Sequence, residues 1–236
     1  MEFGRTKNET GMGDPPTDMD TELRGIGMTS ARTRERLINR LRDVGIEDER
    51  VLEVIRTTPR HYFIDEALAH QAYDDTALPI GHGQTISQPW VVARMTELLI
   101  AERVPEKVLE IGTGCGYQTA VLAALCGQVH SVERIRPLQD RARQRLISLG
   151  LARVQLKHAD GGFGWKAAAP FDGILVACAR PEIPRELLDQ LADGGRLVMP
   201  VGDRVQHLTV VDRVGDEIHT RQLDAVRFVP FQRGVQ

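Results

Sequence analysis

The sequence predicts an α/β fold: a doubly wound, mostly parallel sheet with an added antiparallel edge pair and N-terminal helices. At Val108–Tyr117 an apolar run breaks into three closely spaced glycines before a helical pattern begins. Such a strand, turn and helix open a nucleotide-binding sheet. Strand-length apolar runs then alternate with helical segments as far as Val201, which is typical of a parallel sheet. Two later strand-like runs favour the antiparallel edge pair.

The composition is that of an ordinary globular chain. With 236 residues, 42% of them hydrophobic and 27% charged, the chain can form one large domain or two small ones. A net charge of −3 gives no reason to expect a broad nucleic-acid surface. No apolar run is long enough to span a bilayer, and no signal segment is recognisable. We therefore expect a cytoplasmic protein with neither a nucleic acid nor a membrane as partner.

The cysteines indicate no metal site. Cys115, Cys126 and Cys178 are sparse, odd in number and without the spacing of metal ligands. We therefore expect no metal, and the cysteine usage suggests a reducing compartment.

The N-terminal part is predicted to be a tail followed by helices. Residues 1–27 are rich in Gly, Pro, Thr, Asp and Glu and have few apolar anchors, so they are predicted to be flexible. Thr29 or Ser30 suits the N-cap of a first helix, which Gly45 ends.

Two further helical segments are expected before the glycine loop. A helix over Asp48–Thr57 ends before Pro59, and its buried side consists of Val51, Leu52, Val54 and Ile55. A short helical piece is expected over Asp65–Tyr73.

The stretch Leu78–Pro89 differs in character from its surroundings. Its glycines, prolines and small polar residues predict an ordered loop rather than a helix or strand. Loops of this length inside compact domains are often functional. A helix is expected to resume at Trp90.

The elements after the glycine loop are expected in a simple order. They are a helix over 118–125, a strand over 129–133, a helix over 135–149, strands over 154–158 and 171–177, a helix over 186–191, a turn at 194–195, and strands over 196–201, 208–211 and 218–228.

The spacing of the glycines narrows the ligand of the loop. Dinucleotide sites prefer glycine at the first, third and sixth positions. Here Gly112, Gly114 and Gly116 occupy the first, third and fifth positions, and Tyr117 occupies the sixth. This pattern matches the loop of methyltransferases that bind S-adenosylmethionine, where no pyrophosphate has to be held.

Two acids at strand ends support this interpretation. Glu133 ends the strand after the loop and suits hydrogen bonds from both ribose hydroxyls, although NAD sites use such an acid too. Asp160, beside Gly161, can accept a hydrogen bond from the adenine amino group. A helix or turn cap is the commoner role of such an Asp. Three sites at successive strand ends nevertheless favour a cofactor there.

With these residues in place, the chain resembles the protein-L-isoaspartate O-methyltransferases of the bacterial type, within class I S-adenosylmethionine-dependent methyltransferases. The similarity covers about residues 27–231, and the segment from Leu78 to Pro89 is its most specific part. The matching segments are Ala72–Asp75, Leu78–Gly81, Gly83–Pro89, Val108–Tyr117, Pro170–Asp172, Gln190–Leu191, Gly194–Gly195 and Phe228–Pro230.

The resemblance implies a Rossmann-like methyltransferase sheet and its cofactor. Residues 28–236 form one methyltransferase domain, with a helical substrate-side cap over 28–101 and the cofactor-binding sheet over 102–236. The cofactor is S-adenosyl-L-methionine, and the product is S-adenosyl-L-homocysteine. The expected cofactor-binding residues are Glu110, Gly112, Thr113, Gly114, Gly116, Tyr117, Glu133, Asp160 and Gly161.

The resemblance also implies a substrate and an active-site residue. The family methylates the free α-carboxylate of L-isoaspartyl residues in damaged proteins and peptides, which begins their repair. Ser87 is the expected active-site residue, and Gln84, Thr85 and Ile86 line the substrate wall with it. A carboxylate is already deprotonated at neutral pH, so Ser87 need only orient it, and no general base is required. We expect the protein to act as a monomer.

The sequence departs from the family pattern at one segment, and two histidines near the substrate side also need a role. Cys178 and Arg180 lie in a segment where relatives usually have Thr-Ala-Ala. Arg180 either adds a positive charge near the substrate carboxylate or points to solvent, and we favour solvent. We expect His82 to lie on the surface and His61 to be packed or hydrogen-bonded near the substrate entrance.

Two other functions remain open. One is a methyltransferase that uses the same cofactor on another small or peptide carboxylate. The other is a non-catalytic protein that binds the cofactor or isoaspartyl segments without turnover. An assay of paired isoaspartyl and aspartyl peptides with labelled cofactor distinguishes among the three.

Overall fold

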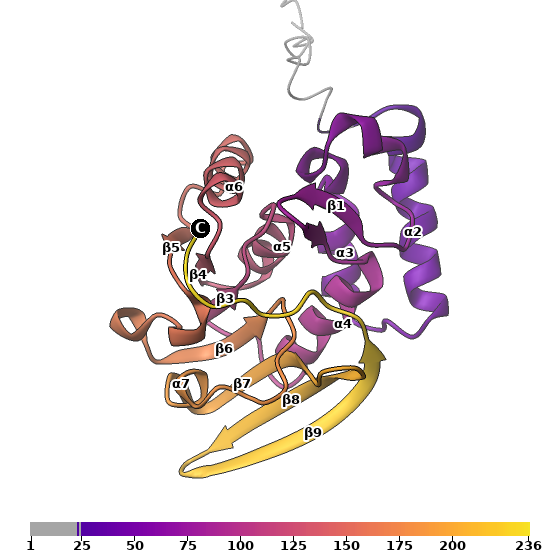
Figure 1. Ribbon diagram of the computed structural model, residues 1–236. Coiled ribbons are helices and arrows are strands. Elements are labelled where there is room, and N and C mark those ends of the chain that lie inside the picture. Colours follow the sequence, from indigo (N-terminus) through magenta and orange to yellow (C-terminus); the bar gives the residue numbers. More distant parts are fainter. Residues whose placement is uncertain (1–22, 24) are drawn as a thin grey trace, which may run out of the picture.

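The computed structural model describes Leu23 and residues 25–236 of the chain (Figure 1). The flexible tail predicted for residues 1–27 falls almost wholly outside these residues. Within the described residues, no helix is long and apolar enough to cross a membrane. The same part of the chain holds no group of three or more His, Cys, Asp or Glu side chains placed to bind a metal ion.

A seven-stranded sheet forms the centre of the fold, in the order β5-β4-β3-β6-β7-β8-β9. The first five strands of that order run parallel, and β8 and β9 pair antiparallel at one edge. The predicted doubly wound sheet with its added edge pair is therefore confirmed. The strands span Lys107–Ile111 (β3), Gln128–Glu133 (β4), Gln155–His158 (β5), Phe171–Val176 (β6), Leu191–Val201 (β7), Gln206–Val214 (β8) and Glu217–Val226 (β9).

Alternate residues of the strands face two separate cores. In β3, Val108 belongs to a core covered by helices α4, α5 and α6, whereas Leu109 and Ile111 belong to the core on the opposite face. This alternation is the period-two pattern of a strand that is covered on both sides. The covering helices span Pro89–Ile100 (α4), Tyr117–Leu125 (α5) and Arg136–Ser148 (α6) on one face, and Gly161–Phe163 (η4), Lys166–Ala168 (η5) and Arg185–Leu188 (α7) on the other.

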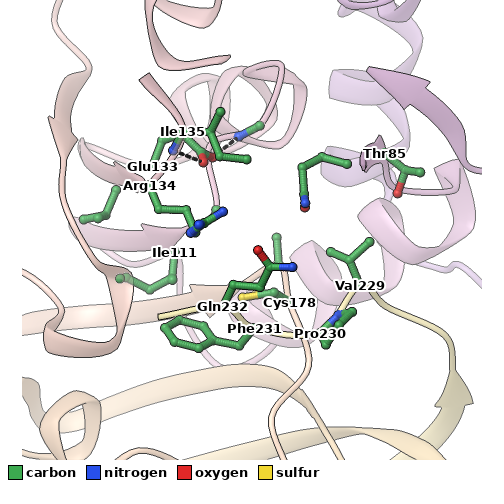
Figure 2. Close-up of a pocket in the computed structure, with 16 residues that line it drawn as sticks. Thr85, Ile111, Glu133, Arg134, Ile135, Cys178, Val229, Pro230, Phe231 and Gln232 are labelled. Carbon is green, nitrogen blue, oxygen red and sulfur yellow. Dashed lines mark hydrogen bonds between the residues drawn. The ribbon is translucent and has the colours of Figure 1, made fainter. Parts of the chain in front are cut away.

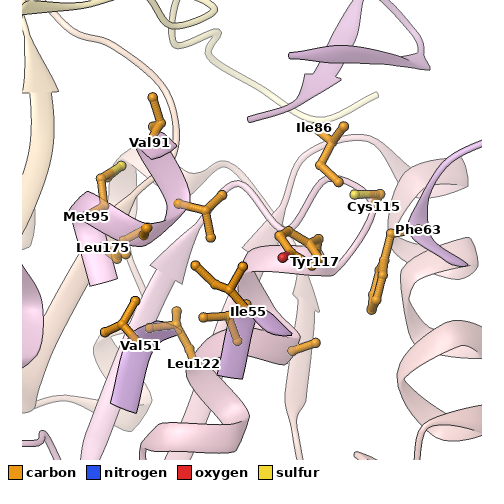
Figure 3. Packing of buried hydrophobic residues seen from close by; sticks show 14 of the residues in the cluster. Val51, Ile55, Phe63, Ile86, Val91, Met95, Cys115, Tyr117, Leu122 and Leu175 are labelled. Atoms are coloured by element: carbon orange, nitrogen blue, oxygen red, sulfur yellow. The ribbon is translucent and has the colours of Figure 1, made fainter. Parts of the chain in front are cut away.

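The N-terminal elements extend the first of these cores. Figure 3 shows Val51 and Ile55 of one N-terminal helix beside Leu122 of α5. Ser30 takes the N-cap position of the first α-helix, but its side chain accepts no capping bond from a backbone N–H group, whereas Asp48 caps the second helix by accepting from two. The elements span Gly27–Thr29 (η1), Ala31–Asp43 (α2), Glu49–Thr57 (α3), Arg60–Phe63 (η2) and Glu66–Gln71 (η3).

The stretch predicted to be a loop is a β-hairpin. Leu78–Gly81 (β1) pairs antiparallel with Gln84–Ile86 (β2), so the loop prediction was wrong. His82 and Gly83 form a two-residue turn and both have positive φ, 54° and 68°, as a tight hairpin requires. Leu78 and Ile86 are buried as an opposed pair, and this apolar face holds the hairpin on the core.

The helix predicted over 186–191 is shorter than expected. It ends at Leu188, and β7 begins at Leu191 and continues through Gly194 and Gly195. The register between β6 and β7 shifts after Leu191, which pairs with Phe171. The two glycines therefore lie in an irregular stretch of strand, where their missing side chains allow the bend.

A C-terminal strap, residues 227–236, returns across the carboxyl ends of the parallel strands (Figure 1). Val229 and Phe231 bond to the backbone of Ala179, and Gln236 N donates to Arg134 O at 2.7 Å. The strap therefore joins the end of the chain to the edge of the sheet where the cofactor loop lies.

Candidate active site

A cavity lies at the carboxyl ends of β3, β4 and β6 (Figure 2). Gln84 and Thr85 of β2 border it on the hairpin side, and residues 229–232 of the strap border it on another. Parallel sheets place their ligands at this edge. The sheet, the hairpin and the strap thus converge on one site.

The glycine loop turns beneath this cavity. Gly112 and Gly114 line it, with φ values of 97° and 54°, a region that side chains rarely adopt. Gly112 N donates to Val132 O at 2.8 Å, which fastens the loop to the neighbouring strand. The loop backbone can therefore approach a ligand closely.

Glu133 is held rigidly at the wall of the cavity. Its Oε2 accepts from Gly114 N at 2.8 Å, and its Oε1 accepts from Ile135 N at 2.9 Å (Figure 2). Each carboxylate oxygen keeps a further lone pair. The side chain is therefore oriented to accept two more hydrogen bonds from a diol.

Asp160 forms a turn cap, the alternative role considered for it. Its Oδ1 accepts from Gly162 N at 2.9 Å, and its Oδ2 accepts from Gly234 N of the strap at 2.6 Å. Gly161 lines the cavity, and a Cβ there would lie 2.4 Å from Ile111 Cγ2. A contact between Asp160 and a base remains a prediction.

Glu110 lies beneath the loop and does not line the cavity. It is fully buried, and its Oε2 accepts from Thr119 Oγ1 at 2.5 Å and from Ser131 Oγ at 2.6 Å. Thr113 Oγ1 shares a 2.6 Å hydrogen bond with the same Ser131 hydroxyl. Desolvation by burial raises the pKa of Glu110 to about 7. This network supports the loop from below.

Gly116 and Tyr117 also support the loop from within the core. A Cβ on Gly116 would lie 3.2 Å from Ala142 of α6, so glycine is needed for this close packing. The Tyr117 ring packs edge-on against Phe63, with the ring centroids 5.5 Å apart (Figure 3). Of the nine predicted cofactor residues, only Gly112, Gly114, Glu133 and Gly161 line the cavity.

A second cavity, of about 350 Å³, contains Ser87. Thr85 lines both cavities, so they meet at the hairpin. Arg227 is the only charged residue among the described residues that line this second cavity. Ile86 is buried behind the hairpin and supports the wall rather than facing the cavity.

Asp75 fixes the segment around Ser87. Its two carboxylate oxygens accept from Gln88 Nε2 at 2.9 Å and from Trp90 N at 2.8 Å. Asp75 therefore anchors the residues on the C-terminal side of Ser87 and the start of α4. The fully buried Arg60 donates from Nε to Ala72 O at 2.9 Å, three residues before Asp75.

Comparison with known proteins identifies the family. A family profile described as protein-L-isoaspartate(D-aspartate) O-methyltransferase matches residues 32–236. The chain belongs to this family. The protein-L-isoaspartate O-methyltransferase of Alcanivorax borkumensis is 78% identical over 218 residues, which cover 92% of this chain and 99% of the relative. Protein-L-isoaspartate O-methyltransferase 1 of Marinobacter nauticus is 62% identical over 217 residues, which cover 92% of this chain and 99% of the relative.

A solved structure from the protein-L-isoaspartate O-methyltransferase family has the same fold. A Plasmodium falciparum chain, described as such an enzyme in complex with S-adenosyl-L-homocysteine, aligns with a TM-score of 0.74 and 26% identity. The alignment covers 84% of this chain and 98% of that chain. The Rossmann-like methyltransferase fold expected from the resemblance is therefore confirmed.

Arg180 differs from the expectation for this family member. It was expected to point to solvent, but it is half-buried, and its guanidinium lies 4.6 Å from the centre of the Phe231 ring. This cation–π contact ties the segment after β6 to the strap. His82 is exposed, as expected, and His61 is hydrogen-bonded, since its Nδ1 bonds with Tyr73 OH at 2.8 Å. The place of His61 near the substrate entrance stays a prediction.

Several cavity residues of this methyltransferase fold were missed by the sequence analysis. Ile111, Val132 and Ile135 line the cofactor cavity, but in the sequence they are ordinary apolar residues of strand ends. Phe231 and Gln232 come from the strap, about 100 residues away from β4 along the chain. The Phe228–Pro230 match to the family was the one available signal for the strap.

Proposed function

We propose that this protein transfers a methyl group from S-adenosyl-L-methionine to the free α-carboxylate of L-isoaspartyl residues in damaged proteins and peptides. The junction of the two cavities at Thr85 carries the proposal, because a donor in one lies beside an acceptor in the other. The 78% identical relative is named for the same activity.

The residues present in the first cavity fit the cofactor. The rigid Glu133 carboxylate matches the two ribose hydroxyls, and Gly112 and Gly114 leave room for the chain of the amino acid. The apolar side chains of Ile111 and Ile135 suit the adenine faces. When bound, S-adenosylmethionine supplies the methyl group as part of a sulfonium cation.

The second cavity suits a carboxylate substrate. A carboxylate is ionised at neutral pH and needs no general base before it reacts. We assign Ser87 the role of donating a hydrogen bond that orients the carboxylate, with Thr85 beside it. Arg227 attracts the anion. Catalysis then rests on alignment and on the exclusion of water by the strap and hairpin.

A paired peptide assay tests the proposal. Two peptides that differ only in one isoaspartyl or normal aspartyl linkage are incubated with cofactor labelled on its methyl group. We expect label in the isoaspartyl peptide and none in its partner. Equal labelling of both peptides, or of neither, contradicts the proposal. Methylation of a small carboxylic acid without the isoaspartyl peptide would support the alternative substrate class.

We further propose that the protein acts as a cytoplasmic monomer without nucleic-acid or membrane partners. The modest net charge of −3 supports the absence of a nucleic-acid partner. Light scattering during size-exclusion chromatography tests the oligomeric state, and the expected mass is that of the 26.3 kDa chain.

A further inference from the structure

A third cavity, of about 380 Å³, lies on the other side of the hairpin from Ser87. We call it the basic cavity, lined by Phe63, Leu68, Leu138, Arg141 and Arg145 together with parts of β1. Its floor is apolar, since Phe63 and Leu138 are buried. Neither the cofactor-binding residues nor Ser87 lines this cavity.

The two arginines outnumber the one carboxylate of the described lining, so this cavity has a net positive charge. Arg145 is half-buried, and its side chain has no hydrogen-bond or ion-pair partner among the described residues. Arg141 donates from Nη2 to Ile80 O at 3.1 Å and from Nε to Pro137 O at 3.4 Å, which leaves Nη1 for another partner. Asp65 is the one carboxylate of the described lining, and its Oδ1 accepts from Ala67 N. A partly buried cation without a counter-charge favours an anionic ligand.

The hairpin connects this cavity to the active site. Pro79 lines the basic cavity and pairs directly with Thr85, which borders the cofactor and Ser87 cavities. Opposed residues of an antiparallel pair point to the same face, and the strands lie about 5 Å apart. Pro79 and Thr85 are both exposed, so this face of the hairpin is a path between the sites.

We infer that the basic cavity binds a flanking segment of the substrate chain, in which an apolar residue is followed by an acidic one. This inference rests on the proposed function. An extended chain rises about 3.3 Å per residue, so a segment about three residues from the isoaspartyl residue reaches from Thr85 across Pro79. Its apolar side chain packs on Phe63 and Leu138, and its carboxylate pairs with Arg145 and Arg141.

Peptide kinetics test the inference. Isoaspartyl peptides carry Leu-Glu, Leu-Gln or Leu-Lys about three residues before or after the isoaspartyl position, and kcat/KM is measured for each. We expect kcat/KM to be about fivefold higher for the Leu-Glu peptide than for the Leu-Gln peptide, the size of a favourable exposed ion pair. This difference is expected only when the flank lies on one side of the isoaspartyl residue, either before or after it. The preference is expected to shrink as salt is added.

Variants on α6 locate the effect. Arg145→Gln is expected to remove the Glu preference, and Arg145→Lys to keep most of it. Arg143→Gln is the matched control, because Arg143 lies on the same helix but donates to Leu156 O and does not line the cavity. A short isoaspartyl peptide without flanks is expected to react equally well with all variants. Equal loss of the preference in Arg143→Gln and Arg145→Gln overturns the inference, as does the absence of any preference.

A binding measurement separates this inference from the proposed function. Fluorescence anisotropy follows labelled peptides that carry the Leu-Glu or Leu-Gln flank and a normal aspartyl residue. We expect the wild type to bind the Leu-Glu peptide about fivefold more tightly than the Leu-Gln peptide. The Arg145→Gln variant is expected to bind the two peptides equally. If the wild type binds Leu-Glu more tightly than Leu-Gln but methylates no isoaspartyl peptide, the proposed function is overturned and the role of the basic cavity is not. If it methylates isoaspartyl peptides but binds both flanks equally, only the role of the basic cavity is overturned.

Discussion

Arg227 brings the only positive charge among the described lining of the Ser87 cavity, and it is exposed there. A guanidinium in such a position steers and holds an anion without reacting with it. Its contribution is thus to binding of the carboxylate, whereas Ser87 orients the attacking oxygen. The two residues are expected to affect different kinetic constants.

Replacement of Arg227 by Gln is expected to raise KM for an isoaspartyl peptide about fivefold and to change kcat little. The reason is that an exposed charge contributes to binding of substrate and transition state alike. Steady-state kinetics at low salt measure both constants. Arg221→Gln provides the control, since it removes the same charge from β9, where Arg221 pairs with Asp212. An unchanged KM in Arg227→Gln contradicts the assignment.

Ser87→Ala is expected to leave cofactor binding intact and to lower methyl transfer about 10- to 100-fold, the range for loss of a hydrogen bond to a charged group. Calorimetric titration with S-adenosylhomocysteine measures binding, and labelled methyl transfer measures turnover. Unchanged turnover would remove Ser87 from the mechanism.

Residue identities alone were sufficient for some site positions and not for others. Glycine spacing and an acid at a strand end predicted Gly112, Gly114 and Glu133, because backbone conformation and charge follow from those residue types. The spacing of residues did not predict which groups the Asp160 carboxylate hydrogen-bonds. Its Oδ2 bonds to Gly234, 74 residues along the chain. Long-range backbone contacts of this kind are not encoded in a local pattern.

At the scale of elements, the hairpin was missed because its local composition is that of a loop. Two glycines flank His82, and Pro79 lies within β1, features that usually interrupt strands. What makes the segment a hairpin is the burial of Leu78 and Ile86 on one face, which depends on the core beneath. Strands β3 and β6 needed no such context, because apolar residues form most of each strand.

The strap is expected to open when the cofactor enters or leaves. The cavity that it borders has a volume of about 80 Å³, smaller than the roughly 300 Å³ of ordinary ligand pockets. The last three residues of the strap are held at the sheet edge, where Gly234 N donates to Asp160 Oδ2, Gln236 N donates to Arg134 O and Gln236 O accepts from Arg136 N. Opening of this end requires these bonds to break, while residues 228–231 stay bonded to Ala179 and Gln206.

Deletion of residues 234–236 is expected to speed the release of S-adenosylhomocysteine at least tenfold. The deletion removes six hydrogen bonds made by Gly234 and Gln236, and at about 1 kcal/mol for each net bond the loss of even two of them lowers the barrier enough for a tenfold change. Stopped-flow displacement measures the release rate. Arg213→Gln, at the far end of β8, serves as a control that leaves the strap complete. An unchanged release rate in the shortened chain contradicts a gating role.

At the scale of the whole molecule, the doubly wound sheet and its cover of helices on both faces followed from hydrophobic patterning. Strand and helix alternation restricts the topology to a doubly wound sheet. The three cavities could not be anticipated in this way. Each lies between elements distant in sequence, as Phe63, Ile80 and Leu138 illustrate for the basic cavity. Cavities arise from how elements dock, and only the assembled fold determines them.

Glu110 couples the stability of the whole fold to pH. Its pKa is raised to about 7 in the folded protein, mainly because burial penalises the charged form. The unfolded chain loses this proton near pH 4.5. Between these two values the folded state holds more protons than the unfolded state, so the contribution of Glu110 to stability falls as pH rises.

The isosteric variant Glu110→Gln is expected to remove this pH dependence. The free energy of unfolding of the variant minus that of the wild type is expected to rise between pH 5 and pH 8, by about 3 kcal/mol at most. The Ser131 and Thr119 hydroxyls can still donate to the amide oxygen, so the network under the cofactor loop survives. Urea unfolding at several pH values measures the difference, with Glu47→Gln, an exposed carboxyl, as the control. A difference that stays constant with pH, or that matches the Glu47 control, would mean that Glu110 is already ionised in the folded protein.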